Sequence, residues 1–131
     1  MGAEKRLPVS VGSLMKGPVV TTGSETTLRD AARDLRRAEA GTLVVMEGSA
    51  IAGILSERDV VRALAEDANP DEVWVGDVMS EEPRYLTVGD EVGSALEIML
   101  AAGIRHLPVV DEAELVGIVS IRDLSKALLP P

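Results

Sequence analysis

Two short polar phrases in the chain place an aspartate three residues after a serine. They are Ser56–Asp59 and Ser120–Asp123. Such a pair predicts a capping box, in which a serine and an acidic side chain satisfy the free N–H groups at the start of a helix. A carboxylate has several acceptor positions, so the same aspartates can also accept hydrogen bonds from a bound molecule.

The two phrases close two copies of one repeat, which lie 64 residues apart. The seven-residue phrase that ends at Asp59 returns at Asp123 with five positions identical. The same offset pairs Met15 with Met79 without a gap. A repeat of this length indicates two copies of one supersecondary unit rather than a solenoid. Because two copies usually pack about a pseudo-twofold axis, the repeated polar residues are the first candidates for a ligand site.

A helix is expected early in each copy, because apolar residues recur at helical spacing around 28–35 and 92–99. Ser24 and Asp90 lie upstream of these helices as candidate caps. Gly41 and Gly103 follow them, where helices often end.

Short strands surround these helices and give each copy the order β-α-β-β-α. Short extended pieces, 19–20 and 85–86, precede the helices. Two apolar strands joined by a short loop follow each helix, as in a hairpin, and we expect them at Leu43–Met46, Ile51–Leu55, Leu107–Val110 and Leu115–Val119. A last helix begins at each repeated serine. We therefore predict an α/β (α+β) fold with repeat 1 at 9–66, an acidic linker at 67–72 and repeat 2 at 73–129.

Composition excludes several classes of function. A net charge of -9 argues against a surface that binds nucleic acid, which requires a basic patch, and against an anionic membrane. The chain has no cysteine and one histidine, which disfavours thiol chemistry and a zinc site. The start of the chain has no signal-peptide core, and no apolar run could span a bilayer. We therefore expect a cytoplasmic protein.

The repeat resembles a known family. Its element order, its Gly-apolar-apolar-Ser-x-x-Asp ending and the phrase from Ile104 to Asp111 are similar to those of the CBS domain. Two in tandem resemble the CBS pair, or Bateman module, over about residues 9 to 129. The resemblance implies a stand-alone regulatory module that binds an adenosine-containing ligand between its repeats. AMP, ADP or ATP would be expected first, with S-adenosylmethionine or a dinucleotide as further options. It also implies a homodimer that acts on an unknown regulated protein.

The same resemblance assigns roles to individual residues. The Asp59 and Asp123 carboxylates would accept the ribose hydroxyls, as an acidic residue does in dinucleotide folds. Arg105 and His106 would contact phosphate, for which an arginine offers forked, charge-assisted bonds. The other candidates are Arg58 and Arg122 as weaker phosphate ligands, and Ser56 and Ser120 beside the aspartates. Met15 and Gly41 would line the base pocket of the Asp123 site, and Met79 would line that of the Asp59 site.

Copy one departs from this pattern. The positions that match Arg105 and His106 are Gly41 and Thr42, so no cation stands there. We therefore expect two unequal sites, with the one that holds Asp123 better suited to a nucleotide.

Two alternatives compete with the ligand sensor. A structural module that dimerises with unoccupied clefts would show the same helix caps. An enzyme is disfavoured, because the chain has no nucleophile–base pair, no metal cluster and no Walker-type phosphate loop.

Overall fold

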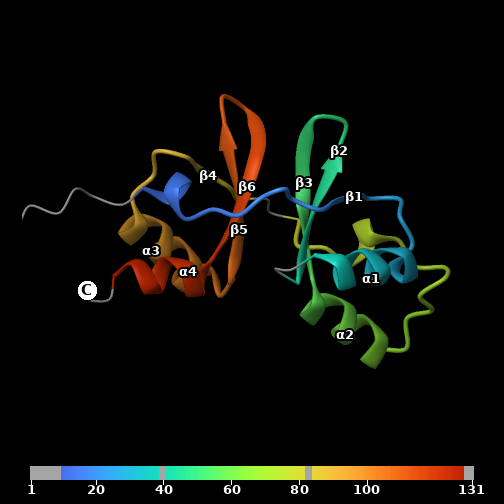
Figure 1. Cartoon of the computed structure of the whole chain (residues 1–131). Coiled ribbons are helices and arrows are strands. Elements are labelled where there is room, and N and C mark those ends of the chain that lie inside the picture. Colours follow the sequence, from blue (N-terminus) through green and yellow to red (C-terminus); the bar gives the residue numbers. More distant parts are fainter. Residues whose placement is uncertain (1–9, 39–40, 82–83, 129–131) are drawn as a thin grey trace, which may run out of the picture. The chain divides into compact units, whose positions relative to one another are not determined.

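The computed structural model describes residues 10–38, 41–81 and 84–128 (Figure 1). Within these ranges the chain forms two compact units. Unit 1 joins the described residues up to Gly17 to those from Tyr85 onward, and unit 2 is Pro18–Arg84. Unit 1 is therefore built from two separate stretches of the sequence.

Unit 2 is a three-stranded sheet with helices. Its elements are β1 (Thr21–Gly23), α1 (Leu28–Arg37), β2 (Thr42–Glu47), β3 (Ala50–Ser56), α2 (Glu57–Ala65) and the 3-10 helix η2 (Val75–Asp77). The strand order is β1-β2-β3, with β1 parallel and β3 antiparallel to the central strand. Helix α1 packs on β2 and helix α2 packs on β3. The predicted β-α-β-β-α order is confirmed here.

Unit 1 repeats this arrangement. Its elements are the 3-10 helix η1 (Val11–Ser13), β4 (Leu86–Thr87), α3 (Val92–Ala102), β5 (His106–Asp111), β6 (Glu114–Ser120) and α4 (Ile121–Ala127). The strand order is β4-β5-β6, again with one parallel and one antiparallel pairing. Both hairpins carry a register shift at the same repeat position, Val45/Met46 and Val109/Val110. The α+β fold expected from the sequence is thus confirmed in both copies.

The helix starts differ from expectation at two points. Ser24 does not cap α1, because Thr27 is the N-cap and its Oγ1 accepts from the Asp30 N–H at 3.2 Å. Asp90 does not cap α3 either; its carboxylate accepts from the N–H and Oγ1 of Thr87, both at 2.9 Å, and so closes the preceding turn. Short polar side chains bond to whichever nearby backbone group the turn presents, which sequence spacing alone does not specify.

Helix α3 ends where the sequence predicted, and strand β1 begins later than expected. Gly103 caps the end of α3 with a φ of 69°, as predicted. The first strand starts at Thr21, after the predicted 19–20 piece, although the Val20 carbonyl accepts from the Val44 N–H at 3.3 Å.

Aliphatic side chains build both cores, as the near-absence of aromatic residues requires. In unit 2 the cluster of buried residues comprises Leu28, Ala31, Leu35, Leu43, Val45, Leu55, Val60, Ala63 and Val75. The repeat-equivalent Val92, Ala95, Met99, Leu107, Val109, Val119 and Leu124 are buried in unit 1. The helical stripes seen in the sequence are therefore core.

A lead-in segment completes the sheet region of each unit. In unit 1, Lys16 exchanges two backbone hydrogen bonds with Ile118, at 2.8 and 3.0 Å. The Met15 side chain lies against Gly117, where an added Cβ would be 2.6 Å from its sulfur. Lys16 precedes β1 in the chain, yet it pairs beside β6. The start of the first repeat therefore belongs to the unit that holds the second hairpin.

Candidate functional site

Four candidate residues of unit 1 meet where strand β6 passes into helix α4. His106 is the cross-strand partner of Ser120. The Ile121 N–H donates to the Arg105 carbonyl at 2.8 Å. Arg105 is exposed and His106 is half-buried. The antiparallel register thus brings the Arg-His phrase beside the Ser-x-x-Asp phrase, although the two are separated by the length of a hairpin.

Asp123 lies in the first turn of α4. Ser120 is the N-cap, and its Oγ accepts from the Asp123 N–H at 3.1 Å. The Asp123 carboxylate forms an ion pair with Lys16, with Nζ 3.7 Å from Oδ2, and its side chain is 18% exposed. Within the three described ranges, this ion pair is the only side-chain interaction of that carboxylate. Its lone pairs are therefore largely available to a ligand.

Lys16 was not among the residues that the sequence singled out. Its partner Asp123 lies near the other end of the chain. The pair forms because Lys16 is hydrogen-bonded beside β6 through its backbone. The repeat offset held a partial signal, since it aligns this lysine with Ser80 and so marks a charge present in one copy only.

Unit 2 holds the equivalent serine and aspartate in a different arrangement. Ser56 and Asp59 form a complete capping box. Asp59 Oδ2 accepts from the Ser56 N–H at 2.9 Å and from its Oγ at 3.0 Å, and Oδ1 pairs with Arg62 at 3.2 Å. The predicted box is confirmed in full here, whereas α4 shows the serine half alone. Asp59 is consequently engaged within its own helix turn.

The position that matches Arg105 carries no positive charge in unit 2. Gly41 has a φ of 66°, and its carbonyl accepts from the Glu57 N–H at 3.1 Å. A Cβ on Gly41 would lie 3.0 Å from Glu57 Oε1. A carboxylate therefore lies beside Gly41, whereas unit 1 has Ile121 at the position of Glu57. This environment repels an anion.

The remaining candidates follow the same division. Met15 and Met79 are half-buried, in unit 1 and unit 2 respectively. Arg58 and Arg122 are exposed in the first turns of α2 and α4. The structure thus groups the candidate residues into one set per unit, and the unit 1 set is Met15, Arg105, His106, Ser120, Arg122 and Asp123.

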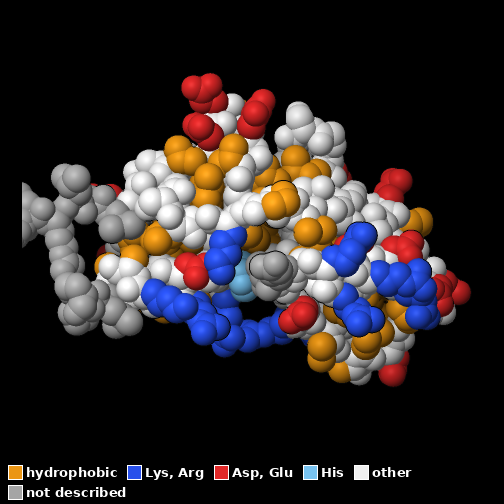
Figure 2. All heavy atoms as spheres, in the orientation of Figure 1, with side chains coloured by type: hydrophobic (Ala, Val, Ile, Leu, Met, Phe, Trp, Pro, Cys, Tyr) orange, Lys and Arg blue, Asp and Glu red, His pale blue; other side chains and the backbone are white. Residues whose placement is uncertain are grey.

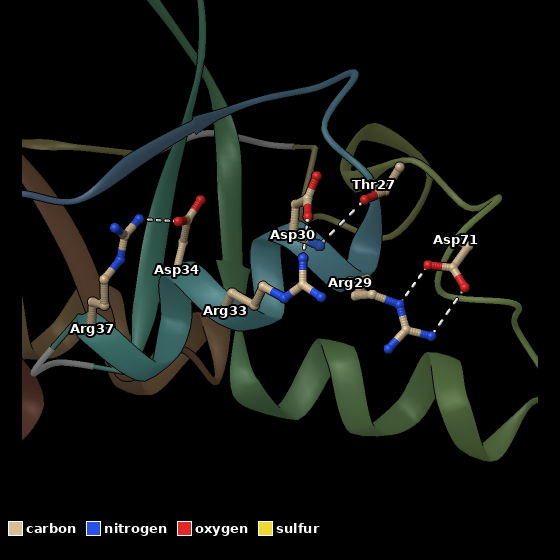
Figure 3. A network of polar contacts seen from close by, with 7 residues as sticks. All are labelled: Thr27, Arg29, Asp30, Arg33, Asp34, Arg37 and Asp71. Carbon is tan, nitrogen blue, oxygen red and sulfur yellow. Dashed lines mark hydrogen bonds and ion pairs between the residues drawn. The ribbon is translucent and has the colours of Figure 1, made fainter.

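A second gathering of charge lies over helix α1, where Figure 2 shows many Lys and Arg side chains. The close view in Figure 3 shows that three of these arginines point at carboxylates. Arg33 pairs with Asp30 at 3.1 Å, and Arg37 pairs with Asp34 one turn later. Pairs at this helical spacing are modestly stabilising features of exposed helices.

The third arginine of this cluster reaches outside the helix. Arg29 Nε and Nη2 donate to the two Asp71 carboxylate oxygens at 2.5 and 3.0 Å (Figure 3). The hydrogen bond from Arg29 lowers the pKa of Asp71, and the carboxylate raises the pKa of Arg29. This contact ties the segment after α2 to the start of α1. We interpret the cluster as structural, since these three arginines are already paired.

Residues 10–38, 41–81 and 84–128 contain no group of three or more His, Cys, Asp or Glu side chains arranged to hold a metal ion. In the same ranges, no helix combines the length and apolar character needed to cross a membrane.

Known proteins share this arrangement. The family model described as CBS domain matches the chain twice, at residues 11–66 and 75–130. An uncharacterized 17.7 kDa protein of Acidianus ambivalens is 36% identical over 125 residues, covering 94% of this chain and 75% of that protein. The chain spans 61% of the length of two further relatives, from Methanopyrus kandleri and Arabidopsis thaliana.

Solved structures with bound nucleotides have the same fold. A CBS domain protein from Pyrobaculum aerophilum complexed with AMP is 31% identical, with a TM-score of 0.80 over 88% of this chain and 89% of that one. The cytosolic domain of the Mg²⁺ channel MgtE in complex with ATP is 28% identical, with a TM-score of 0.75 over 91% of this chain and 48% of that one.

Proposed function

Since this chain belongs to the CBS-domain family, we propose that it is a regulatory module that binds an adenine nucleotide and signals to a partner protein by a conformational change. AMP, ADP and ATP are the ligands proposed first, with S-adenosylmethionine or a dinucleotide as further candidates. One observation carries the proposal. The Asp123 carboxylate makes no capping bond, and it lies in the same unit as the Arg105-His106 phrase, in which His106 is the cross-strand partner of Ser120.

Ser120 caps helix α4 beside Asp123, and every other residue of the unit 1 set has a direct role in this proposal. Asp123 accepts hydrogen bonds from the ribose hydroxyls, for which a carboxylate has enough acceptor positions. Arg105 and His106 contact phosphate, and Arg122 is a weaker candidate for the same role. Met15 contributes adaptable apolar surface to the base. In this proposal, unit 1 supplies both an acceptor for the ribose hydroxyls and cations for the phosphate.

The unit 2 set is proposed as a second and weaker site. Its members are Ser56, Arg58, Asp59 and Met79, and Gly41, which was expected at the Asp123 site, lies in the same unit. Asp59 would have to give up hydrogen bonds of its capping box to accept a ribose, and Glu57 opposes a phosphate beside Gly41. We expect nucleotide to bind here more weakly than in unit 1.

The proposed mechanism is regulatory and includes no catalytic step. A ligand shifts a conformational equilibrium only by its difference in affinity for the two states. We propose that the module works as a homodimer in the cytoplasm and that the regulated protein contacts whichever state the nucleotide favours.

Thermal unfolding of the purified protein against AMP, ADP, ATP, NAD, S-adenosylmethionine and GMP tests the proposal. A ligand that binds only the folded state raises the unfolding midpoint. We expect a rise with an adenine ligand that disappears in Asp123→Ala and persists in Asp111→Ala, an exposed aspartate of the same unit. A panel without any shift, on protein freed of carried-over ligand, would refute the proposal.

A structural dimerisation module is the second candidate function. Exposed apolar residues on α2, Val61 at 65% and Leu64 at 47% exposed, favour it, because such residues often mark contact surfaces. If the protein is a dimer whose mass and dissociation constant do not change with any ligand in the panel, this function is supported instead.

A further inference from the structure

The charge of Lys16 in unit 1 faces the Asp123 carboxylate. Its backbone is fixed to Ile118 by two hydrogen bonds, and its side chain extends to Asp123. We propose that Lys16 determines the specificity of the Asp123 site for phosphorylated ligands. The inference rests on the proposed function and goes further, since it says why that site takes a nucleotide in preference to the nucleoside.

The Lys16 backbone is held in place, but the ion pair between its side chain and Asp123 is weak. The Nζ–Oδ2 separation of 3.7 Å exceeds the distance of about 2.7–3.2 Å that an N–H···O hydrogen bond requires. The Lys16 side chain is 69% exposed, so water screens the attraction. Ribose hydroxyls can therefore take over the carboxylate at little cost, while the fixed backbone keeps the ammonium nearby.

Charge explains what the lysine does once a ribose is bound. An ionised Asp123 repels a phosphate attached to the same sugar. The Lys16 ammonium offsets that repulsion, and its flexible stem with three donors lets it turn from the carboxylate to a phosphate oxygen. A nucleoside offers no such oxygen, so it gains nothing from Lys16. The lysine thus adds affinity for the phosphorylated ligand alone.

The repeat supplies an internal comparison. Ser80 occupies the position of Lys16 in unit 2 and makes the equivalent backbone bonds to Ile54, at 3.0 and 3.4 Å. The backbone arrangement is therefore shared, and the ammonium is not. At the position of Arg105, unit 2 has Gly41 with the Glu57 carboxylate beside it. The two sets differ in charge rather than in fold.

Calorimetric titration with AMP and with adenosine tests the inference. The titrations use an Asp59→Asn background, which weakens the unit 2 site because an amide has one acceptor oxygen in place of two. That oxygen can still accept from the Ser56 N–H, so the helix start is kept. In Lys16→Gln we expect AMP affinity to fall about fivefold to tenfold, as for a charge-assisted bond in partly exposed surroundings. Adenosine affinity should stay within about twofold, which is less than one net hydrogen bond. The matched control Lys126→Gln removes an exposed lysine of α4 and should change neither affinity.

The outcomes separate this inference from the proposed function. An unchanged ratio of AMP to adenosine affinity in Lys16→Gln overturns the role of Lys16 and leaves nucleotide binding intact. Equal losses for both ligands also overturn it, because they show general support of the site. Wild-type protein that binds neither ligand overturns the proposed function itself. Retention of the AMP preference in Lys16→Arg, together with its loss in Lys16→Gln, supports the inference.

Discussion

Asp59 accepts a hydrogen bond from the backbone N–H of Ser56 at 2.9 Å and thereby closes its capping box. Asp123, at the same repeat position, pairs with Lys16 instead. Two equivalent phrases thus use their carboxylates differently, one for helix stability and one for a contact across its unit.

We expect the two aspartates to contribute unequally to stability. Asp59→Ala should lower the free energy of unfolding by about 1 kcal/mol, the usual effect of losing a cap. Asp123→Ala keeps the bond from its backbone N–H to Ser120 and loses a 3.7 Å ion pair to a largely exposed lysine, so the change should stay within about 0.5 kcal/mol. Urea unfolding of both variants measures this, and equal losses would contradict it.

The lead-in segments closely approach Gly53 in unit 2 and Gly117 in unit 1, which predicts a second difference in stability between equivalent substitutions. A Cβ at residue 53 would lie 2.3 Å from the Ser80 carbonyl oxygen, which is backbone, whereas at residue 117 the nearest atom is the flexible Met15 sulfur at 2.6 Å. Gly53→Ala should therefore cost about 1–3 kcal/mol and Gly117→Ala less. Thermal unfolding compares them. Gly93→Ala is the control, because its site in α3 is open and it should be neutral or stabilising.

Core truncation should act on each unit through its own hairpin. Leu43 and Leu107 are fully buried at equivalent positions, and each change to Ala should cost about 2–5 kcal/mol. The single tryptophan, Trp74, lies in unit 2, so its fluorescence follows the unfolding of that unit. Leu43→Ala should lower the denaturant midpoint reported by Trp74. An unchanged midpoint would show that Leu43 is not part of that core.

The Arg29–Asp71 pair predicts a pH dependence. Arg29 lowers the pKa of the Asp71 carboxyl in the folded protein, so the unfolded chain binds the proton more readily. The contribution is present above the ordinary carboxyl pKa of about 4 and is lost as pH falls through the lower folded value. The difference in unfolding midpoint between wild type and Asp71→Asn should therefore shrink below about pH 4. Arg29→Gln should remove the same difference, and a constant difference would contradict the prediction.

Much of the fold followed from the sequence because the repeat supplied two independent patterns for each element. The helical stripe around Leu35 and its copy around Met99 both form core, and the hairpins lie close to the predicted ranges. The caps were less predictable. Thr27 rather than Ser24 starts α1, since the turn geometry decides which side chain meets a free N–H.

The residue types of the candidate site were predictable from the sequence, whereas the contacts between these residues were less so. The phrases at Ser56 and Ser120 both predicted a box, yet only the first closes fully. In the second phrase Asp123 pairs with Lys16, whose backbone is hydrogen-bonded to Ile118. No local pattern reports a contact between residues so distant in the chain.

The discontinuous composition of unit 1 has a consequence for how the protein is made. Residues 10–17 emerge from the ribosome before unit 2, but the strand that they pair with, β6, emerges after it. Unit 2 is continuous and can fold while translation proceeds. Until β6 has been synthesised, the lead-in segment has no strand to pair with. The Lys16–Asp123 pair can therefore form only after unit 2 and the start of helix α4 have been translated.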